Sequence, residues 1–244
     1  MRFSLITINT WKCDGNYSKR LPVLAHELAT FRPTFIFCQE VFDSIDGPIS
    51  TKEYLKERLE MKAYFFPSRK KNRMVDHKNI LSFSGLCLFT NHNLAHYEEY
   101  RLPDHASDRD RTAQFAIVHE ENKRIGVINT HLTHLKGEDE LRESQLHHLL
   151  EKLKKHTVDL LIICGDLNAT QNSKPIQLLK NDPHQFKNIF DYEPTHVSGR
   201  CIDYIFYKSD RNCTILNKRI ILEELIEGLR PSDHFGLYVD LKLN

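Results

Sequence analysis

Carboxylate, amide and imidazole side chains follow apolar segments throughout this 244-residue chain. In the clearest case, residues 160–164 are apolar and lead through Gly165 to Asp166 and Asn168. Such a run predicts a strand buried on both faces, and Asp166 and Asn168, two apart, would point to the same side of it. Burying a carboxylate and an amide there is costly unless something binds them. Because Gly, Asp and Asn also form turns, this stretch alone leaves a turn and a functional site open.

Polar groups of this kind stand at the ends of six predicted strands. One such group is usually a turn or a cap, and a lone histidine at a strand end is usually structural. Six strand ends of the same character instead indicate a shared site, because ligands of α/β sheets collect at strand ends. The groups are Asn9, Glu40, His131, Asp166 with Asn168, Asp203, and Asp233 with His234.

The chemical types in this set favour metal-assisted hydrolysis. Carboxylate and amide oxygens suit Mg²⁺ or Mn²⁺. Histidines suit proton transfer and the stabilisation of an anionic transition state. No Ser or Cys stands in a nucleophile-elbow motif. Together these side chains predict attack of water on a phosphoester with the help of a bound metal ion.

Apolar periodicity predicts the elements that must position these groups. Helices are expected over residues 18–31, 51–60, 138–155 and 176–179. Strands are expected over residues 3–10, 34–38, 63–66, 84–90, 113–119, 124–129, 160–164, 203–207 and 235–243. Residues 101–112 are charged and predict an irregular segment. Because runs of strands separate the helices, a layered α/β sandwich with a mixed sheet is favoured over a regular doubly wound fold.

Composition narrows the class of protein. The chain has no linker-like or low-complexity tract, so one domain over residues 1–244 is expected. A net charge of +1 and a pI of about 7.7 show that the surface as a whole is not that of a polyanion binder. The basic run at residues 69–73 is expected to be a solvated loop, and it is also the best local candidate for contact with phosphates.

The cysteines and the N-terminal residues predict an intracellular protein. The six cysteines are scattered and form no C-x-x-C pair, so reduced thiols are expected and zinc is not. Residues 1–9 alternate like a strand and make a poor signal peptide. No apolar run approaches the roughly 20 residues of a membrane span. We therefore expect a cytoplasmic monomer with no transmembrane segment and no obligate protein partner.

Short motifs in a fixed order resemble the endonuclease/exonuclease/phosphatase (DNase-I-like) superfamily over essentially the whole chain. Each motif alone is weak, but the ordered set is strong. The motifs are Asn9-Thr10-Trp11, Gln39-Glu40-Val41, Asn129-Thr130-His131-Leu132, Gly165-Asp166-Leu167-Asn168, Ile202-Asp203-Tyr204 and Ser232-Asp233-His234. The resemblance implies a four-layered α/β sandwich, in which two mixed, mostly antiparallel sheets pack face to face with helices outside. It also implies a Mg²⁺-dependent phosphoester hydrolase, with Mn²⁺ as an alternative ion.

The resemblance further implies roles for the polar groups. Glu40 would hold the metal, helped by Asn9 and Asp233. Asp166 would orient or deprotonate the attacking water. The identity of the true base, and whether one or two metal ions bind, stay open.

The remaining groups would act on the phosphate. His234 would stabilise its developing charge or donate a proton, and Asp203 would pair with His234 and fix its tautomer. Arg111 resembles an arginine that several members place near the phosphate, although Arg109 is nearby. His134 is a candidate for lining the pocket, with a structural surface histidine as the alternative. The implied catalytic set is His131, Asp166, Asn168, Asp203 and His234, and the implied substrate-binding set is Arg111, His134 and Asn168.

The motifs specify the reaction better than the substrate. Residues 84–89, 202–208 and 228–234 resemble neutral sphingomyelinases, which suggests a phospholipid phosphodiesterase, although no strong amphipathic membrane anchor is evident. A metal-dependent nuclease acting on DNA or RNA is the main alternative, with residues 69–73 as part of a basic groove. A catalytically inactive scaffold of the same fold is an alternative of another class, and the intact set of acidic residues argues against it.

Overall fold

The computed structural model describes residues 1–45, 47–181 and 183–244, and its strands form two six-stranded sheets. The first sheet contains β1 (Arg2–Asn9), β2 (Phe35–Ser44), β3 (Lys62–Val75), β4 (Lys78–Thr90), β11 (Cys213–Ile221) and β12 (Gly236–Leu243). The second contains β5 (Leu94–Arg101), β6 (Thr112–Glu120), β7 (Lys123–His131), β8 (Leu160–Asp166), β9 (Lys187–Asn188) and β10 (Asp203–Ser209). The helices are α1 (Tyr17–Thr30), α2 (Thr51–Leu59), α3 (Asp139–Leu153) and α4 (Lys174–Lys180).

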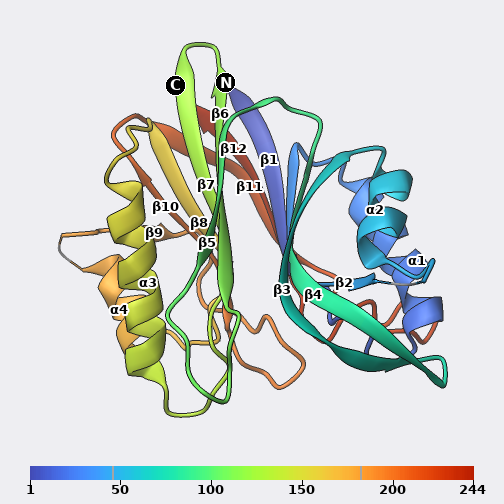
Figure 1. The fold of residues 1–244 in the computed structure, drawn as a ribbon. Coiled ribbons are helices and arrows are strands. Elements are labelled where there is room, and N and C mark those ends of the chain that lie inside the picture. Colours follow the sequence, from blue (N-terminus) through green and yellow to red (C-terminus); the bar gives the residue numbers. More distant parts are fainter. Residues whose placement is uncertain (46, 182) are drawn as a thin grey trace.

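The two sheets pack face to face, with α1 and α2 outside one sheet and α3 and α4 outside the other (Figure 1). One apolar cluster fills the space between the sheets, and two further clusters lie beneath the helices. Each sheet has a single parallel pair among antiparallel ones. The four-layered sandwich of mixed, mostly antiparallel sheets is therefore confirmed, whereas the prediction of one domain over residues 1–244 remains untested.

The parallel pair of each sheet sets the place of the site. In the first sheet, α1 connects β1 to β2, and Asn9 lies beside Gln39 where the parallel pairing of the two strands ends. In the second, α3 connects β7 to β8, and His131 lies beside Asp166. The order of the strands is β11-β12-β1-β2-β4-β3 in one sheet and β5-β6-β7-β8-β10-β9 in the other. Both parallel pairs are thus interior to their sheets, and their carboxyl ends carry the polar groups.

Strand alternation explains why these polar groups face one another. Along β1, Phe3 and Leu5 join the cluster between the sheets, and Asn9 follows them on the same face. Along β8, Ile162 and Cys164 occupy the corresponding face, and Asp166 follows them. The same alternation that buries the core therefore delivers an amide and a carboxylate to the space between the sheets.

The prediction of a solvated loop at residues 69–73 is wrong, because this run lies within β3. After a register shift between Pro67 and Arg69, β3 pairs with β4 without interruption up to a tight turn at Asp76 and His77, both with left-handed backbone angles (φ 46° and 65°). A two-residue turn of this hand matches the twist of a hairpin, so it extends the strand through the basic run.

The helices that the structure describes are too short or too polar to cross a membrane. Strands β5, β9 and β11 were not predicted. Their burial alternates or is slight, and β5 and β9 are the edge strands of their sheet, so none has the apolar run of a central strand.

Candidate active site

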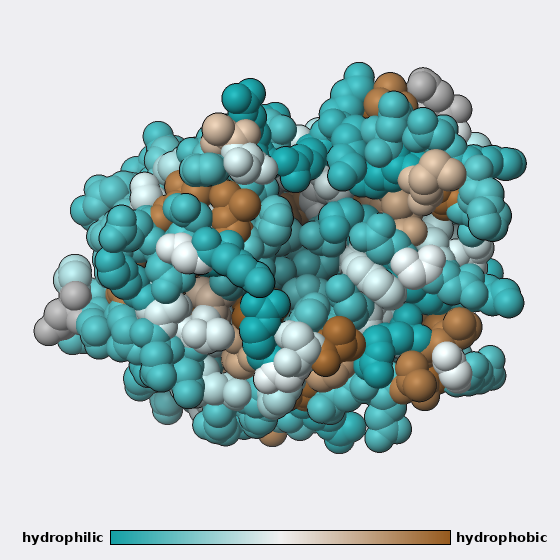
Figure 2. All heavy atoms as spheres, turned by 90° about the horizontal axis from the view of Figure 1, so that it is seen from below, coloured by the Kyte–Doolittle hydropathy of each residue, from teal (hydrophilic) through white to brown (hydrophobic). Residues whose placement is uncertain are grey.

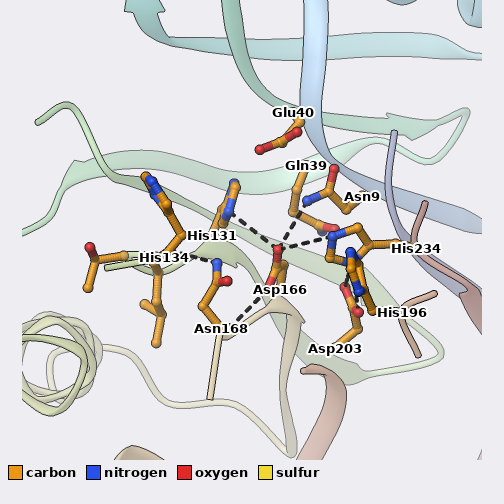
Figure 3. Close-up of polar contacts among 12 residues, drawn as sticks. Asn9, Gln39, Glu40, His131, His134, Asp166, Asn168, His196, Asp203 and His234 are labelled. Carbon is orange, nitrogen blue, oxygen red and sulfur yellow. Dashed lines mark hydrogen bonds and ion pairs between the residues drawn. The ribbon is translucent and has the colours of Figure 1, made fainter. Parts of the chain in front are cut away.

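Asp166 is the centre of a polar network between the two sheets (Figure 3). The Asn9 amide donates a hydrogen bond from Nδ2 to Asp166 Oδ2 at 3.0 Å, and the Asn168 backbone N–H donates to Asp166 Oδ1 at 2.9 Å. The bond to Asn9 joins the ends of β1 and β8, which belong to different sheets. This carboxylate therefore links the two sheets at the edge of the apolar cluster between them.

Two histidines face the same carboxylate oxygen, one at the end of β7 and the other just before β12. His131 Nε2 lies 3.4 Å from Asp166 Oδ2, and His234 Nε2 lies 3.7 Å from it. Burial and the charge of Arg111 hold the pKa of His131 well below its ordinary value. Burial also lowers the pKa of His234, but the negative charges of Asp203 and Asp166 outweigh it and raise this pKa to about 10. His131 is therefore a neutral imidazole at pH 7, and His234 carries a positive charge.

Asp203 fixes the orientation of His234. Asp203 lies opposite Asp166 in the pairing of β8 with β10, so the two carboxylates lie near each other. His234 Nδ1 lies 2.9 Å from Asp203 Oδ2, and the Thr195 hydroxyl donates to the same oxygen at 2.7 Å. With Nδ1 held by Asp203, Nε2 is the atom that His234 turns toward Asp166.

The environment of Asp166 suits a general base near neutral pH. Burial raises the pKa of Asp166 to about 7, with a further contribution from the Asp203 carboxylate, and the charge of His234 opposes the increase. A base is most effective when its pKa lies close to the working pH. Neighbouring titratable groups whose pKa values are shifted in opposite directions are typical of acid–base sites.

Glu40 reaches the site through an irregularity in β2. The β2–β4 register shifts between Cys38 and Val41, and Glu40 has a left-handed backbone (φ 54°). Strict alternation after Gln39, which faces the other sheet through its bond to Asn129, would turn Glu40 toward the helices. The bulge instead places its carboxylate at the cavity, where Lys12 Nζ lies 2.8 Å from Glu40 Oε2.

The residues predicted to hold metal offer oxygen atoms that a hard cation could use. Asp233 Oδ1 is buried without a hydrogen-bond partner in the described residues, as expected of a ligand atom rather than of a structural carboxylate. Burial raises the pKa of Asp233, and the nearby Glu40 carboxylate adds to the increase. A divalent cation would relieve this crowding of negative charge. The donor set therefore fits Mg²⁺.

The three predicted metal residues do not all form one compact donor cluster. The ligand atoms of Asp233 lie within 4.8 Å of those of His196 and His234, and those of Asp166 lie within 4.8 Å of Asp203 and His234. Glu40 belongs to neither group. The Asn9 amide oxygen accepts the backbone N–H of Trp11 at 3.0 Å, which leaves it one free lone pair.

A cavity of about 260 Å³ adjoins Glu40 and His131. The face of the molecule in Figure 2 is hollowed near its centre, and the surface around the hollow is mainly hydrophilic. Arg69, Lys71 and Arg73 line the cavity, whereas Lys70 of the same strand does not. Alternation along β3 therefore turns every second residue of the basic run toward the cavity. The other charged or titratable lining residues are Lys12, Glu40, Asp108, Arg109, Asp110, Arg111, His131 and His134.

Arg111 and His134 both contact a buried aspartate at the cavity wall. Arg111 Nε lies 2.8 Å from Asp108 Oδ2, and His134 Nδ1 lies 3.3 Å from the same oxygen. The Thr133 hydroxyl donates to Asp108 Oδ2 at 2.6 Å. Asp108 thus positions Arg111 and His134, two of the three predicted substrate-binding residues, beside the cavity, whereas the third, Asn168, contacts Asp166. Arg109 also lines the cavity, so the structure keeps both arginines as candidates.

Three residues of the site were not among the sequence candidates. Lys12 pairs with Glu40, Asp108 holds Arg111, and the His196 ring lies 4.7 Å from that of His234. Lys12 and Asp108 stand in charged or irregular segments, where the sequence offers no contrast with a solvated surface. His196 is far from a strand end, and only its isolated bridge to His234 brings it close.

The structure is thus an α/β sandwich with a cluster of carboxylates and imidazoles between its two sheets. Comparison with known proteins identifies the family to which it belongs. The model of the Endonuclease/Exonuclease/phosphatase family matches residues 6–234. Because this match spans most of the chain, the protein belongs to that family. Its members are phosphoester hydrolases, so the predicted enzyme class is confirmed. No curated protein matches the chain.

Several solved structures have the same fold at low sequence identity. The catalytic domain of human Nocturnin with bound sulfate has 21% identity and a TM-score of 0.76, with 100% of this chain and 95% of that chain covered. A family member from Bacteroides vulgatus has 16% identity and a TM-score of 0.79, and both chains are fully covered (100% and 100%). ANGEL2, described as a 2′,3′-cyclic phosphatase, has 15% identity and a TM-score of 0.77, with 99% and 95% covered. At these identities the likeness shows the fold.

The opposite pKa shifts of the two histidines can be measured in the metal-free protein. With EDTA present, we expect His234 to remain protonated at pH 8 and His131 to remain neutral at pH 6, as read from the ¹⁵N chemical shifts of their rings. Since the pKa of His234 is raised on folding, its stabilising contribution is full below about pH 6.5 and is lost as the pH rises through about 10. Asp203→Asn should move the pKa of His234 toward its ordinary value. A neutral His234 at pH 8 in the unaltered protein would contradict the assignment.

Proposed function

We propose that this protein is a Mg²⁺-dependent hydrolase that directs water at the phosphorus of a phosphoester. The observation that carries the proposal is the buried Asp166 carboxylate, whose pKa of about 7 lies between those of a neutral and a charged histidine that face it. Magnesium as the ion, a monomeric state and a cytoplasmic location remain predictions.

The cation would be held by Glu40, with Asn9 and Asp233 as further oxygen donors. When bound, it would supply positive charge to the phosphoryl oxygens and orient the substrate. Lys12 competes for the same carboxylate, since its ammonium pairs with Glu40 at 2.8 Å. Lys12 would therefore hold the Glu40 carboxylate in place until a divalent cation replaces it.

The protein groups around Asp166 would manage the protons and the charge. Asp166 would take a proton from the attacking water, in an orientation set by the Asn9 amide and the Asn168 backbone N–H. His234, charged and held by Asp203, would donate a hydrogen bond to the negative charge that develops on the phosphoryl oxygens. His131 and Asn168 would hold the remaining oxygens.

The cavity beside this centre would receive the rest of the substrate. Its lining has six Lys and Arg residues against three Asp and Glu residues, and its described residues include no Phe, Tyr or Trp. The cationic group of a choline ester would meet like charge there and no aromatic face to stack on. A second candidate function, hydrolysis of nucleotides or nucleic acid, is therefore favoured over hydrolysis of a sphingomyelin-like headgroup.

A hydrolysis panel tests the proposed reaction. We expect Mg²⁺- or Mn²⁺-dependent turnover, abolished by EDTA, of at least one substrate among bis-p-nitrophenyl phosphate, p-nitrophenyl phosphate, oligonucleotides, mononucleotides and sphingomyelin micelles. Asp166→Asn is the control and should lower kcat by at least about 10³-fold while the protein still folds, because it removes the base. Silence of the unaltered protein on every substrate and metal, or full activity of Asp166→Asn, would contradict the proposal.

The metal requirement tests the role of Glu40. Glu40→Gln should raise the Mg²⁺ concentration for half-maximal rate by at least about tenfold, because it removes a charged ligand. Asp43→Asn is the matched control: Asp43 lies in the same strand but pairs with Lys52 and does not line the cavity, so the requirement should be unchanged. An equal Mg²⁺ requirement in both variants would remove Glu40 from the metal site.

The alternation along β3 provides a matched test of the cavity. Lys71→Ala should raise KM for an anionic substrate by about three- to tenfold with little change in kcat, because it removes attraction that acts equally on ground and transition states. Lys70→Ala removes an equal charge from the opposite side of the strand and should change KM by less than about twofold. Similar effects of the two variants would show that only the overall field matters.

A further inference from the structure

A second group of potential metal ligands lies on the helix-covered side of the second sheet. His96 and Glu98 belong to the edge strand β5, and His156 follows the end of α3. The ligand atoms of these three residues lie within 4.8 Å of one another. None of the three lines the active-site cavity, and none contacts Asp166 in the described structure. The group is therefore separate from the site proposed above.

Each of the two imidazole nitrogens faces one oxygen of the Glu98 carboxylate at a distance compatible with shared coordination of a metal ion. His96 Nε2 lies 3.2 Å from Glu98 Oε1, and His156 Nε2 lies 3.5 Å from Glu98 Oε2. Two ligands that are each bound to Zn²⁺ at about 2.0–2.1 Å, with a tetrahedral angle between them, are about 3.4 Å apart. The two observed separations bracket this value.

Apart from these contacts with Glu98, the two buried imidazole nitrogens have no polar partner in the described residues. His96 Nε2 and His156 Nε2 are both inaccessible to solvent and make no hydrogen bond in the described structure. Leaving such a group unpaired costs free energy, and a bound cation would remove the cost. The rings are held in place by packing, since they lie 4.7 Å apart and the His156 ring lies 4.9 Å from that of Phe115.

The Glu98 carboxylate has a hydrogen-bond donor of the kind that orients the ligands of metal sites. The Tyr100 hydroxyl donates to Glu98 Oε2 and restrains the carboxylate. His96, Glu98 and Tyr100 alternate along β5 and therefore share one face of the strand. The Lys155 ammonium lies 2.7 Å from Glu98 Oε1. Lys155 is the competing partner of the carboxylate, but its side chain is 56% exposed, so it can leave toward solvent when a cation binds.

We propose that His96, Glu98 and His156 bind a divalent transition-metal ion, with Zn²⁺ as the ion that suits them best. Two imidazoles and one carboxylate form a softer donor set than the oxygen ligands of the active site, and imidazole favours zinc over magnesium. The cysteine pattern predicts no zinc, and the proposed ligands are residues that only the fold brings together. Three protein ligands leave a fourth position for water. The bound ion would fasten the edge strand β5 to the turn after α3.

Metal binding by the full chain tests this proposal without any measurement of hydrolysis. The protein is stripped with EDTA, and Zn²⁺ binding is measured by calorimetry and Co²⁺ binding by visible absorption. We expect one tight Zn²⁺ equivalent, an intense tetrahedral Co²⁺ spectrum and a higher thermal midpoint with Zn²⁺. His156→Ala and Glu98→Gln should each weaken this binding by at least about 100-fold. His119→Ala, which removes an exposed histidine of β6, is the control and should bind as the unaltered protein does.

Lys155→Ala gives a test in the opposite direction, which holds even if a ligand variant fails to fold. Removing the competing ammonium should strengthen Zn²⁺ binding by at least about threefold. Equal Zn²⁺ binding by the unaltered protein, His156→Ala and Glu98→Gln would overturn the proposal. So would a Zn²⁺ equivalent that His234→Ala removes and His156→Ala retains, because that ion would sit in the active site. Because none of these binding and stability measurements depends on catalysis, failure of the proposed hydrolase function would leave this test intact.

Discussion

The need to accommodate a buried carboxylate between two sheets governs the structure of this protein. Asp166 stands at the end of a strand whose preceding residues fill the core, so its negative charge lies where water is excluded. An amide, a backbone N–H and two imidazoles surround it. These partners come from both sheets, so the site exists only when the sandwich is assembled. The same partners that offset the energetic cost of the buried charge also form the candidate active site.

The site follows from this arrangement because the surroundings of each group differ. Asp203 supplies a second negative charge on one side and stabilises His234 as a cation. Burial and Arg111 act on the other side and keep His131 neutral. One carboxylate therefore has a charged hydrogen-bond donor and a neutral imidazole as neighbours, and its own pKa lies near neutrality. In the proposed mechanism, three side chains of only two ionisable types would serve as the base, the charge-stabilising group and the group that holds the phosphoryl oxygens.

The sequence predicts the central elements and most of the site but not its edges. The strands of both parallel pairs have apolar runs, and the polar group that ends each run is conspicuous, which is why Asn9, Glu40, His131 and Asp166 could be named. The basic run was predicted to be a loop because this part of β3 is half exposed and lacks the apolar pattern of a buried strand. The strand is extended by a hairpin turn, which no run of apolar residues marks in the sequence. Asp108 and His196 depend on contacts between distant loops. The bulge that redirects Glu40 is a property of pairing, which no local pattern reveals.

The most direct test of the account is a crystal structure with Mn²⁺ and a non-hydrolysable phosphodiester analogue, with the ion located by anomalous scattering. We predict an ion within about 2.2 Å of a Glu40 oxygen, Lys12 displaced from that carboxylate, and a phosphoryl oxygen within hydrogen-bond distance of His234 Nε2. A second ion at His96 and His156 would be distinguished by its position. A bound analogue with no ion at Glu40, while Lys12 keeps its pairing, would contradict metal-assisted hydrolysis at this centre.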